Sequence, residues 1–217
     1  MFDLLKKNVF VLPITRDLTS FEQATPTFKK TNLHKKILLF VGSFTPSKGI
    51  SLLQTILPSL LKHHPDAFFI GIGKGPMLQD LKHSLSSFKD QILFTGKISH
   101  DHVASFMQSA DIVLFPSLWE EPLSGVLFEA MACKKTLVAS DRGGNKEVLV
   151  HKTTGFLLDP LQPQICEQTL ETLLKNKQLR LRIGKQAYRF WKKTYSSDAI
   201  ISQLEEIYHY AIKNNKR

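Results

Sequence analysis

Apolar residues along this chain fall into short runs that alternate with longer amphipathic segments. The short runs predict strands at 36–41, 67–72, 91–95, 111–115, 136–139 and 155–158. The segments between them predict helices at 49–63, 76–88, 101–109, 124–133 and 145–149. Near-continuous apolar strands that alternate with helices are typical of a parallel sheet covered on both faces. The pattern therefore predicts a doubly wound α/β domain, which binds ligands beyond the carboxyl ends of its strands.

The pattern changes at both ends of this region. After residue 160 only helical periodicity remains, at 163–176, 178–193 and 197–213. Before residue 36 there is one strand-like piece at 8–12, followed by a polar stretch at 15–32 for which we predict a loop of low order. We therefore expect a linker-like segment at 1–35, a Rossmann-like domain at 36–160 and C-terminal helices at 161–217.

Composition narrows the class of protein. A chain of 217 residues with 42% hydrophobic and 22% charged residues is typical of one globular domain with appendages, and it excludes a fibrous or disordered protein. The apolar runs are too short to span a bilayer. The N-terminus lacks a signal-peptide pattern, and Cys133 and Cys166 form no disulfide framework. We therefore expect a cytoplasmic protein.

The net charge of +10 is explained either by an anionic partner or by charged side chains on a solvated surface. Much of the excess lies in the last third of the chain, where solvated faces of amphipathic helices explain it as well as any ligand does. The alternatives are phosphate-bearing small molecules and a peripheral contact with the inner face of a membrane. Because the basic residues are not interleaved with aromatic platforms or a reading motif, we expect no nucleic-acid partner.

Two glycine-containing loops follow predicted strands. In the first, Gly42 and Ser43 leave a strand, and Lys48 precedes the start of a helix. Unpaired N–H groups and a lysine at a helix start suit a phosphate, although an ordinary turn with a surface lysine has the same pattern. The second loop, at 71–76, lacks the dinucleotide fingerprint, and a packing turn is its simpler explanation.

The segment 116–133 carries two carboxylates at different depths. Glu129 is the only charged residue between 123 and 133, and helical spacing puts it on an apolar stripe with Ala130 and Cys133. A buried carboxylate there needs a hydrogen-bond partner, which either sugar hydroxyls or a neighbouring group of the fold can provide. Glu121 lies eight residues earlier, at the mouth of the helix, and Ser124 is a candidate N-cap.

Taken together, these motifs resemble the C-terminal, donor-binding domain of group 1 retaining glycosyltransferases, which have the GT-B fold. The most specific element is the pair of glutamates spaced eight apart and followed by Ala130-Met131-Ala132. It is combined with Pro116-Ser117, Gly143-Gly144, Glu147 and Thr154-Gly155. The resemblance is close over 36–160 and looser over the C-terminal helices. The stretch 9–13, followed by Asp17 and Phe21, is similar to the family's interdomain linker.

The resemblance implies transfer of a sugar, with retention, from a nucleotide-diphosphate sugar to an acceptor. It implies that Lys48 holds the diphosphate, Glu129 binds ribose and Glu121 lies beside the donor sugar, with Lys48 and Glu121 as the catalytic residues. No metal ion or other cofactor is expected. The remaining donor-site residues that it implies are Gly42, Ser43, Gly96, Ile98, Ser124, Gly125 and Val126.

Two departures from the family pattern bear on activity. Ser43 stands where the family commonly has arginine, and the candidate replacements are Lys74 or another cation, between which the sequence does not decide. The segment before residue 36 is too short for the N-terminal Rossmann-like domain that carries the acceptor site in the family. We therefore expect a separate N-terminal domain or partner chain. The alternative is a non-catalytic fragment that binds nucleotide sugars or another protein.

Overall fold

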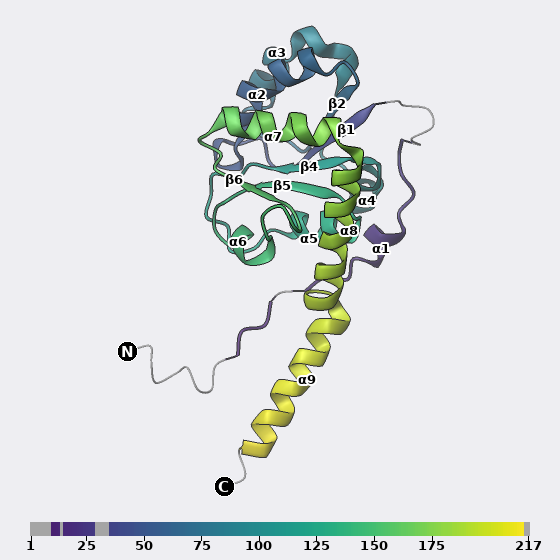
Figure 1. The fold of residues 1–217 in the computed structure, drawn as a ribbon, viewed down its shortest axis with the longest axis vertical. Coiled ribbons are helices and arrows are strands. Elements are labelled where there is room, and N and C mark those ends of the chain that lie inside the picture. The colour runs from purple at the N-terminus through teal and green to yellow at the C-terminus, as the bar shows by residue number, and fades with distance from the viewer. Residues whose placement is uncertain (1–9, 14, 29–34, 215–217) are drawn as a thin grey trace.

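The computed structural model describes residues 10–13, 15–28 and 35–214. Its centre is one six-stranded sheet in the order β3-β2-β1-β4-β5-β6, in which every neighbouring pair is parallel (Figure 1). The strands are β1 Lys36–Val41, β2 Ala67–Ile72, β3 Ile92–Gly96, β4 Ile112–Phe115, β5 Thr136–Ser140 and β6 Phe156–Leu158.

Helices connect and cover the strands. Those before β4 are α1 Thr19–Gln23, α2 Ile50–His63, α3 Leu78–Ser84 and α4 His100–Ser109, with short 3-10 turns at η1 Pro46–Lys48 and η2 Ser86–Gln91. Those after β4 are α5 Gly125–Ala132, α6 Asn145–Val148, α7 Pro163–Lys175, α8 Lys177–Thr194 and α9 Ser197–Asn214.

The sheet has an apolar core on each face, as a doubly wound fold requires. Within β1, Ile37 and Leu39 enter one core, whereas Leu38 and Phe40 enter the other. The first core is covered by α1, α4, α5 and the second half of α8, and the other by α2, α3 and α7. This arrangement confirms the predicted fold class.

Most predicted elements occur within one or two residues of their expected bounds. The main exception is the helix predicted at 76–88, which divides into α3 and η2 with a kink at Phe88. The Ser84 hydroxyl donates to the Leu81 carbonyl oxygen at 2.8 Å. Serine side chains compete in this way with helical hydrogen bonds, which is a physical reason for the early end of α3.

The N-terminal segment corrects a prediction. The loop of low order expected at 15–32 is wrong for residues 19–23, which form α1, while 29–32 lie outside the described residues. Phe21 is fully buried, and the Gln108 amide donates to its carbonyl oxygen at 2.6 Å. One buried aromatic side chain is enough to dock a polar segment, and sequence periodicity over five residues cannot reveal it. Residues 10–12 of the strand expected at 8–12 are not in a strand, and residues 8 and 9 are outside the description.

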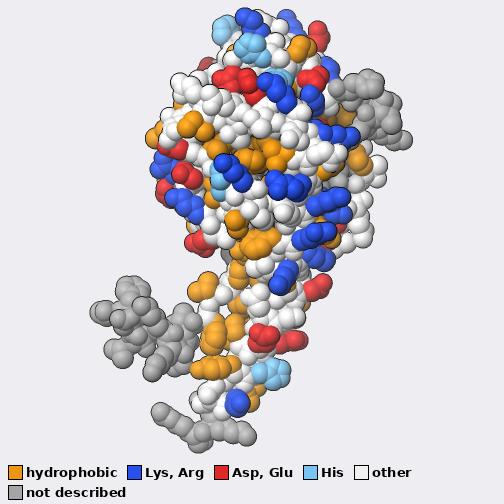
Figure 2. All heavy atoms as spheres, viewed as in Figure 1, with side chains coloured by type: hydrophobic (Ala, Val, Ile, Leu, Met, Phe, Trp, Pro, Cys, Tyr) orange, Lys and Arg blue, Asp and Glu red, His pale blue; other side chains and the backbone are white. Residues whose placement is uncertain are grey.

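The last helix, α9, extends away from the body of the protein (Figure 1). Its only buried residue is Ile200, and the Tyr210 ring meets Phe10 with centroids 5.3 Å apart. Figure 2 shows apolar side chains along α9 and a band of lysines and arginines over α8. The large exposed apolar residues of α9 are Ile201, Tyr208, Tyr210 and Ile212. Within the described residues, no helix has the length and apolar character that crossing a bilayer requires.

Candidate functional site

The sheet order puts the topological switch point at the carboxyl ends of β1 and β4, which is where an open α/β sheet has its crevice. The chain leaves β1 toward β2 and β3 on one side, then returns to β4 and continues to β5 and β6 on the other. Loops on either side of such a switch point diverge, and ligands of open α/β sheets bind between them. The loop after β1 ends in Lys48, and the loop after β4 contains Glu121 and leads into α5.

Gly49 brings these two loops into contact. Its backbone is left-handed, with φ of 74°, and a Cβ atom at this position would overlap the carbonyl oxygen of Pro116. Only glycine combines this conformation with so close an approach. The Ser117 hydroxyl lies 3.1 Å from the Ser47 carbonyl oxygen, and the Leu118 N–H donates to the same carbonyl at 2.8 Å. The end of η1, with Lys48, is therefore fixed against the loop after β4.

Lys48 and Glu121 form an ion pair at the mouth of the crevice. The Ser117 hydroxyl lies 2.9 Å from the same Glu121 oxygen, and the Lys48 ammonium lies 5.7 Å from the centre of the Phe115 ring. The lysine side chain is 29% exposed and the carboxylate 13%, so an incoming ligand can reach both. Two residues to which the family resemblance assigns donor contacts thus neutralise one another in this structure.

A double glycine supports the backbone of Glu121. The Gly144 N–H donates to the Glu121 carbonyl oxygen at 2.8 Å, and a Cβ atom at Gly144 would overlap the carbonyl oxygen of Pro122. The Gly143 N–H donates to the Glu120 carboxylate at 2.5 Å. The Gly143-Gly144 motif therefore helps to hold the 120–122 loop in place.

Glu129 lies deeper, on α5, and is 4% exposed. His100, the first residue of α4, places its Nε2 3.1 Å from Glu129 Oε1. Arg16 places its Nη1 3.9 Å from the same oxygen. The expectation of a buried carboxylate is confirmed, and neighbours from two other segments of the fold provide its partners.

The start of α5 is the second electropositive feature of the crevice. Ser124 occupies the N-cap position but makes no capping hydrogen bond with its side chain. A Cβ atom at Gly125 would lie 2.8 Å from Arg16 Nη1 and 3.6 Å from Glu129 Oε1. The first N–H groups of a helix lack intrahelical partners and carry a partial positive charge. These groups and the Arg16 guanidinium thus meet at the first turn of α5, beside Glu129.

A cavity of about 390 Å³ lies along the carboxyl ends of β1, β2 and β3. Its lining includes Gly42, Ser43, Lys74, Lys97 and Ile98. Gly96 turns the chain here with φ of 70°. The volume lies in the range of small-molecule sites, and the two lysines make the cavity suitable for an anionic ligand.

Both cysteines are buried. Cys133 follows α5, and burial raises the pKa of its thiol to about 12. Burial likewise raises the pKa of Cys166 to about 11. Since the thiolate is the nucleophilic form, neither residue is equipped for covalent chemistry near neutral pH.

The structure places most of the predicted site residues on the loops and helix starts at one edge of the sheet and Glu129 in the second turn of α5, and it adds two residues that were not predicted. His100 follows the predicted Gly96–Ile98 turn at the next helix start, and this position was a usable signal. Arg16 gives no such signal, because only the docking of α1 brings the N-terminal segment to α5.

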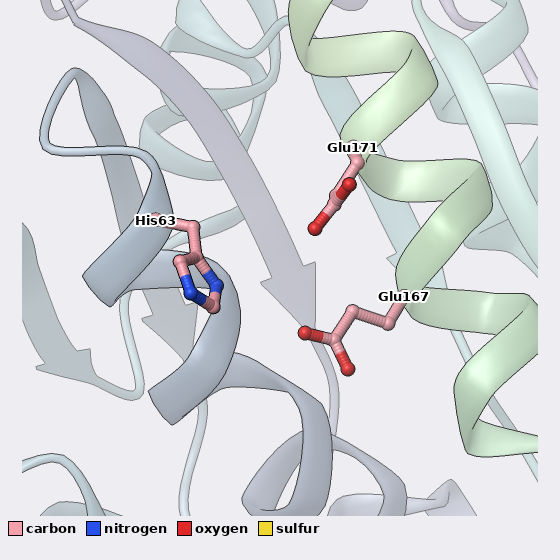
Figure 3. A group of neighbouring side chains, drawn as sticks. All are labelled: His63, Glu167 and Glu171. Carbon is pink, nitrogen blue, oxygen red and sulfur yellow. The ribbon is translucent and has the colours of Figure 1, made fainter.

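One group of side chains outside the crevice has metal-ligand chemistry. His63 of α2 and Glu167 and Glu171 of α7 point toward one another, with ligand atoms within 4.8 Å (Figure 3). His63 is exposed, and Glu171 also pairs with Lys175 at 3.4 Å. The group lies at the far end of α2 from Lys48, about 20 Å along a helix of this length. It is therefore not part of the crevice.

Comparisons with known proteins identify the family and the fold of the chain. A family model described as glycosyl transferases group 1 matches residues 23–190. The chain is 30% identical over 176 residues to alpha-D-kanosaminyltransferase of Streptomyces kanamyceticus, which covers 80% of this chain and 45% of that protein. The chain spans about half the length of the curated relatives that it matches.

Solved structures share the fold. Anabaena HepE in complex with UDP superposes with a TM-score of 0.79 at 21% identity, covering 93% of this chain and 57% of that one. The C-terminal domain of a glycosyl transferase group 1 family protein from Francisella tularensis gives 0.74 at 22% identity, covering 84% of this chain and 99% of that domain. The resemblance to the C-terminal half of the GT-B fold is therefore confirmed. The chain belongs to the glycosyl transferases group 1 family.

Proposed function

We propose that this chain is the donor-binding half of a retaining glycosyltransferase and binds a nucleotide-diphosphate sugar in the crevice between β1 and β4. One observation carries the proposal. Lys48 and the first turn of α5 lie on the two loops of the switch point, with the buried carboxylate of Glu129 behind them. Cationic groups beside a carboxylate match a ligand that carries both phosphates and sugar hydroxyls.

Each predicted residue then has a role in binding. The diphosphate replaces Glu121 as the ion-pair partner of Lys48. It also accepts hydrogen bonds from the backbone N–H groups of residues 124–126. Glu129 accepts hydrogen bonds from the ribose hydroxyls. The base lies in the cavity edged by Gly42, Ser43 and the Gly96–Ile98 turn.

Catalysis in this proposal consists of positioning and charge stabilisation. Lys48 stabilises the charge that develops on the departing nucleoside diphosphate, and Glu121 lies beside the donor sugar at the mouth. The acceptor attacks from the face that the diphosphate leaves, and the leaving phosphate takes the acceptor proton. This front-side route retains the anomeric configuration and uses no metal ion.

A second domain completes the enzyme in this proposal. The chain matches about half of its relatives' length, and α9 together with Phe10 leaves an apolar surface uncovered. We propose that an N-terminal Rossmann-like domain or partner chain packs there and provides the acceptor site. The exposed lysines and arginines of α8 suit a peripheral contact with an anionic membrane surface at the cytoplasmic side.

The second candidate function is a binding module without transferase activity. The loop 42–49 favours it, because Lys48 is the only cationic residue of this loop and is already paired with Glu121, which leaves less positive charge to stabilise a departing diphosphate. The two candidates share donor binding and differ in sugar transfer. Transfer from a labelled nucleotide sugar after addition of an N-terminal half from a relative distinguishes them.

Calorimetry with uridine, guanosine and adenosine diphosphates tests donor binding. Lys48→Ala removes a charge-assisted contact, so the affinity falls roughly ten- to a hundredfold. Lys36→Ala is the matched control, because Lys36 is 30% exposed and pairs with Asp66 at the opposite end of β1. Glu129→Gln also weakens binding while the melting temperature stays close to that of the wild type. Absence of binding at millimolar ligand, or equal loss in the two lysine variants, overturns the proposal.

A further inference from the structure

Arg16 occupies an unusual electrostatic position. Its guanidinium lies against Gly125 at the first turn of α5, the end of a helix that disfavours cations. Glu129 offsets part of this cost, but the ion pair is long, at 3.9 Å, and the arginine side chain is 60% exposed. A loosely paired cation at a positive helix end is better satisfied when an anion lies beside it.

The backbone around Arg16 is anchored by its neighbours, whereas the Arg16 side chain is largely exposed. The Thr15 hydroxyl donates to the Tyr195 carbonyl oxygen at 2.9 Å, and Leu18 and Phe21 are buried in the core. Glu22 accepts a hydrogen bond from the Tyr188 hydroxyl at 2.7 Å and pairs with Lys192 at 3.6 Å. The N-terminal segment is thus held on α8, and a long exposed side chain projects from a fixed point.

A diphosphate bound in the crevice requires more positive charge than Lys48 alone provides. Within the loop 42–49 the only cationic residue is Lys48, which is paired with Glu121, and Ser43 is neutral. A nucleoside diphosphate carries at least two negative charges at neutral pH, so one shared lysine leaves it undercompensated. Lys74 and Lys97 are further cations among the described residues, but they line the cavity at the ends of β2 and β3.

Resting on the proposed function, we infer that Arg16 is the second diphosphate-binding cation of this chain and acts together with Lys48 across the start of α5. When the donor binds, ribose hydroxyls engage Glu129 and the guanidinium turns to the phosphate oxygens. Arginine presents two parallel N–H groups to phosphate, which suits it to this task. The N-terminal segment thereby becomes part of the donor site.

The test compares ligands with and without phosphates. Calorimetry is performed on the full chain with UDP, UMP and uridine, for the wild type, Arg16→Ala, Arg16→Lys and the control Arg182→Ala. Arg182 is exposed on α8 near Arg180, whose carbonyl oxygen binds Thr136 at the amino end of β5. We expect Arg16→Ala to weaken UDP binding about five- to twentyfold and to leave uridine binding within about twofold. Arg16→Lys restores part of the affinity, and Arg182→Ala changes neither ligand's affinity.

Each other outcome is decisive. Equal weakening of UDP and uridine binding means that Arg16 only orders Glu129, and tighter UDP binding means that Arg16 competes with the ligand. Either result overturns the inference. If Lys74→Ala weakens UDP binding and Arg16→Ala does not, Lys74 is the second diphosphate-binding cation and the inference is likewise overturned. If UDP binding depends on Lys48 but not on Arg16, only this inference falls. If the wild type binds no nucleoside diphosphate, the proposed function falls and this inference falls with it.

Discussion

Glu121 and Glu129 belong to one sequence motif, yet the fold treats these two carboxylates differently. Glu121 lies at the mouth of the crevice, and its partners Lys48 and Ser117 come from the two loops that meet there. Glu129 is buried on α5, and its partners Arg16 and His100 come from the N-terminal segment and from α4. The first pair is local to the switch point, whereas the second cluster joins three separate segments.

The difference shows how burial determines what a charged group requires. The Lys48–Glu121 pair at the mouth keeps some contact with water, since its side chains are 29% and 13% exposed, so a ligand can replace one partner at a lower cost than in the interior. A buried carboxylate without hydrogen bonds is costly, so the fold must supply partners before any ligand arrives. The partners of Glu129 therefore depend on the assembly of three segments of the fold, whereas the partners of Glu121 lie on the two loops that a ligand reaches.

The largest effect is expected where the two loops touch. Gly49→Ala forces a side chain into a left-handed backbone and against the Pro116 carbonyl, so we expect a loss of about 2–4 kcal/mol in the free energy of unfolding. Gly96→Ala is the matched control, since its φ is 70° but the nearest atom to the new Cβ is 3.8 Å away. That variant is expected to lose about 1 kcal/mol in urea unfolding. Equal losses in the two variants would show that the loop contact is unimportant.

The next effect concerns the buried carboxylate. His100→Ala removes the hydrogen bond to Glu129 and leaves a buried charge with Arg16 as its nearest cation, so we expect a loss of about 1–2 kcal/mol in unfolding free energy. His100→Gln keeps a donor and recovers part of the loss. The control is denaturant unfolding of the same His100 variants in a Glu129→Gln background. There the loss of unfolding free energy caused by His100→Ala should be smaller. A loss that is independent of Glu129 contradicts the proposed pairing and points to the ring contact with Phe21.

A smaller coupling is expected at the mouth. In a double-mutant cycle of Lys48→Ala and Glu121→Gln, we expect an interaction free energy of about 0.5–1 kcal/mol, because both side chains remain partly accessible to water. The coupling should fall at high salt. If the interaction free energy of the Lys48–Glu121 cycle were larger than that of a His100–Glu129 cycle, the mouth would be more strongly coupled than the interior, contrary to the comparison made above.

The smallest effect is expected at a buried group without a partner. His64 is 6% exposed, its Nε2 has no hydrogen-bond partner within the described residues, and burial lowers its pKa below the usual value near 6.5. The unfolded chain therefore binds a proton more readily, so this residue costs stability as the pH falls below about 6.5. Melting temperatures of the wild type and His64→Gln at pH 7.5 and 5.5 test this, and the variant should lose less on acidification. A greater loss in the variant would mean that His64 gains a partner when charged.

The sequence alone determined the main architecture and the more local half of the site. Apolar runs of strand length alternating with amphipathic segments specify a parallel sheet, because only a sheet covered on both faces buries such runs. The loops that carry Gly42–Lys48 and Glu121–Glu129 each follow a strand, so their meeting at one edge follows from parallel topology. Glu129 was identifiable as a buried carboxylate because it interrupts an apolar helix.

Only the tertiary structure decided which groups satisfy that carboxylate. The polar stretch around Arg16 has a local pattern typical of a loop, and a five-residue helix is too short to show periodicity. Burial of Leu18 and Phe21 docks α1 on α4 and brings Arg16 to α5. Likewise, the pairing of Lys48 with Glu121 depends on Gly49 and Pro116 lying in contact across neighbouring strands. Contacts between segments distant in the chain follow from how the core closes, and no local pattern encodes them.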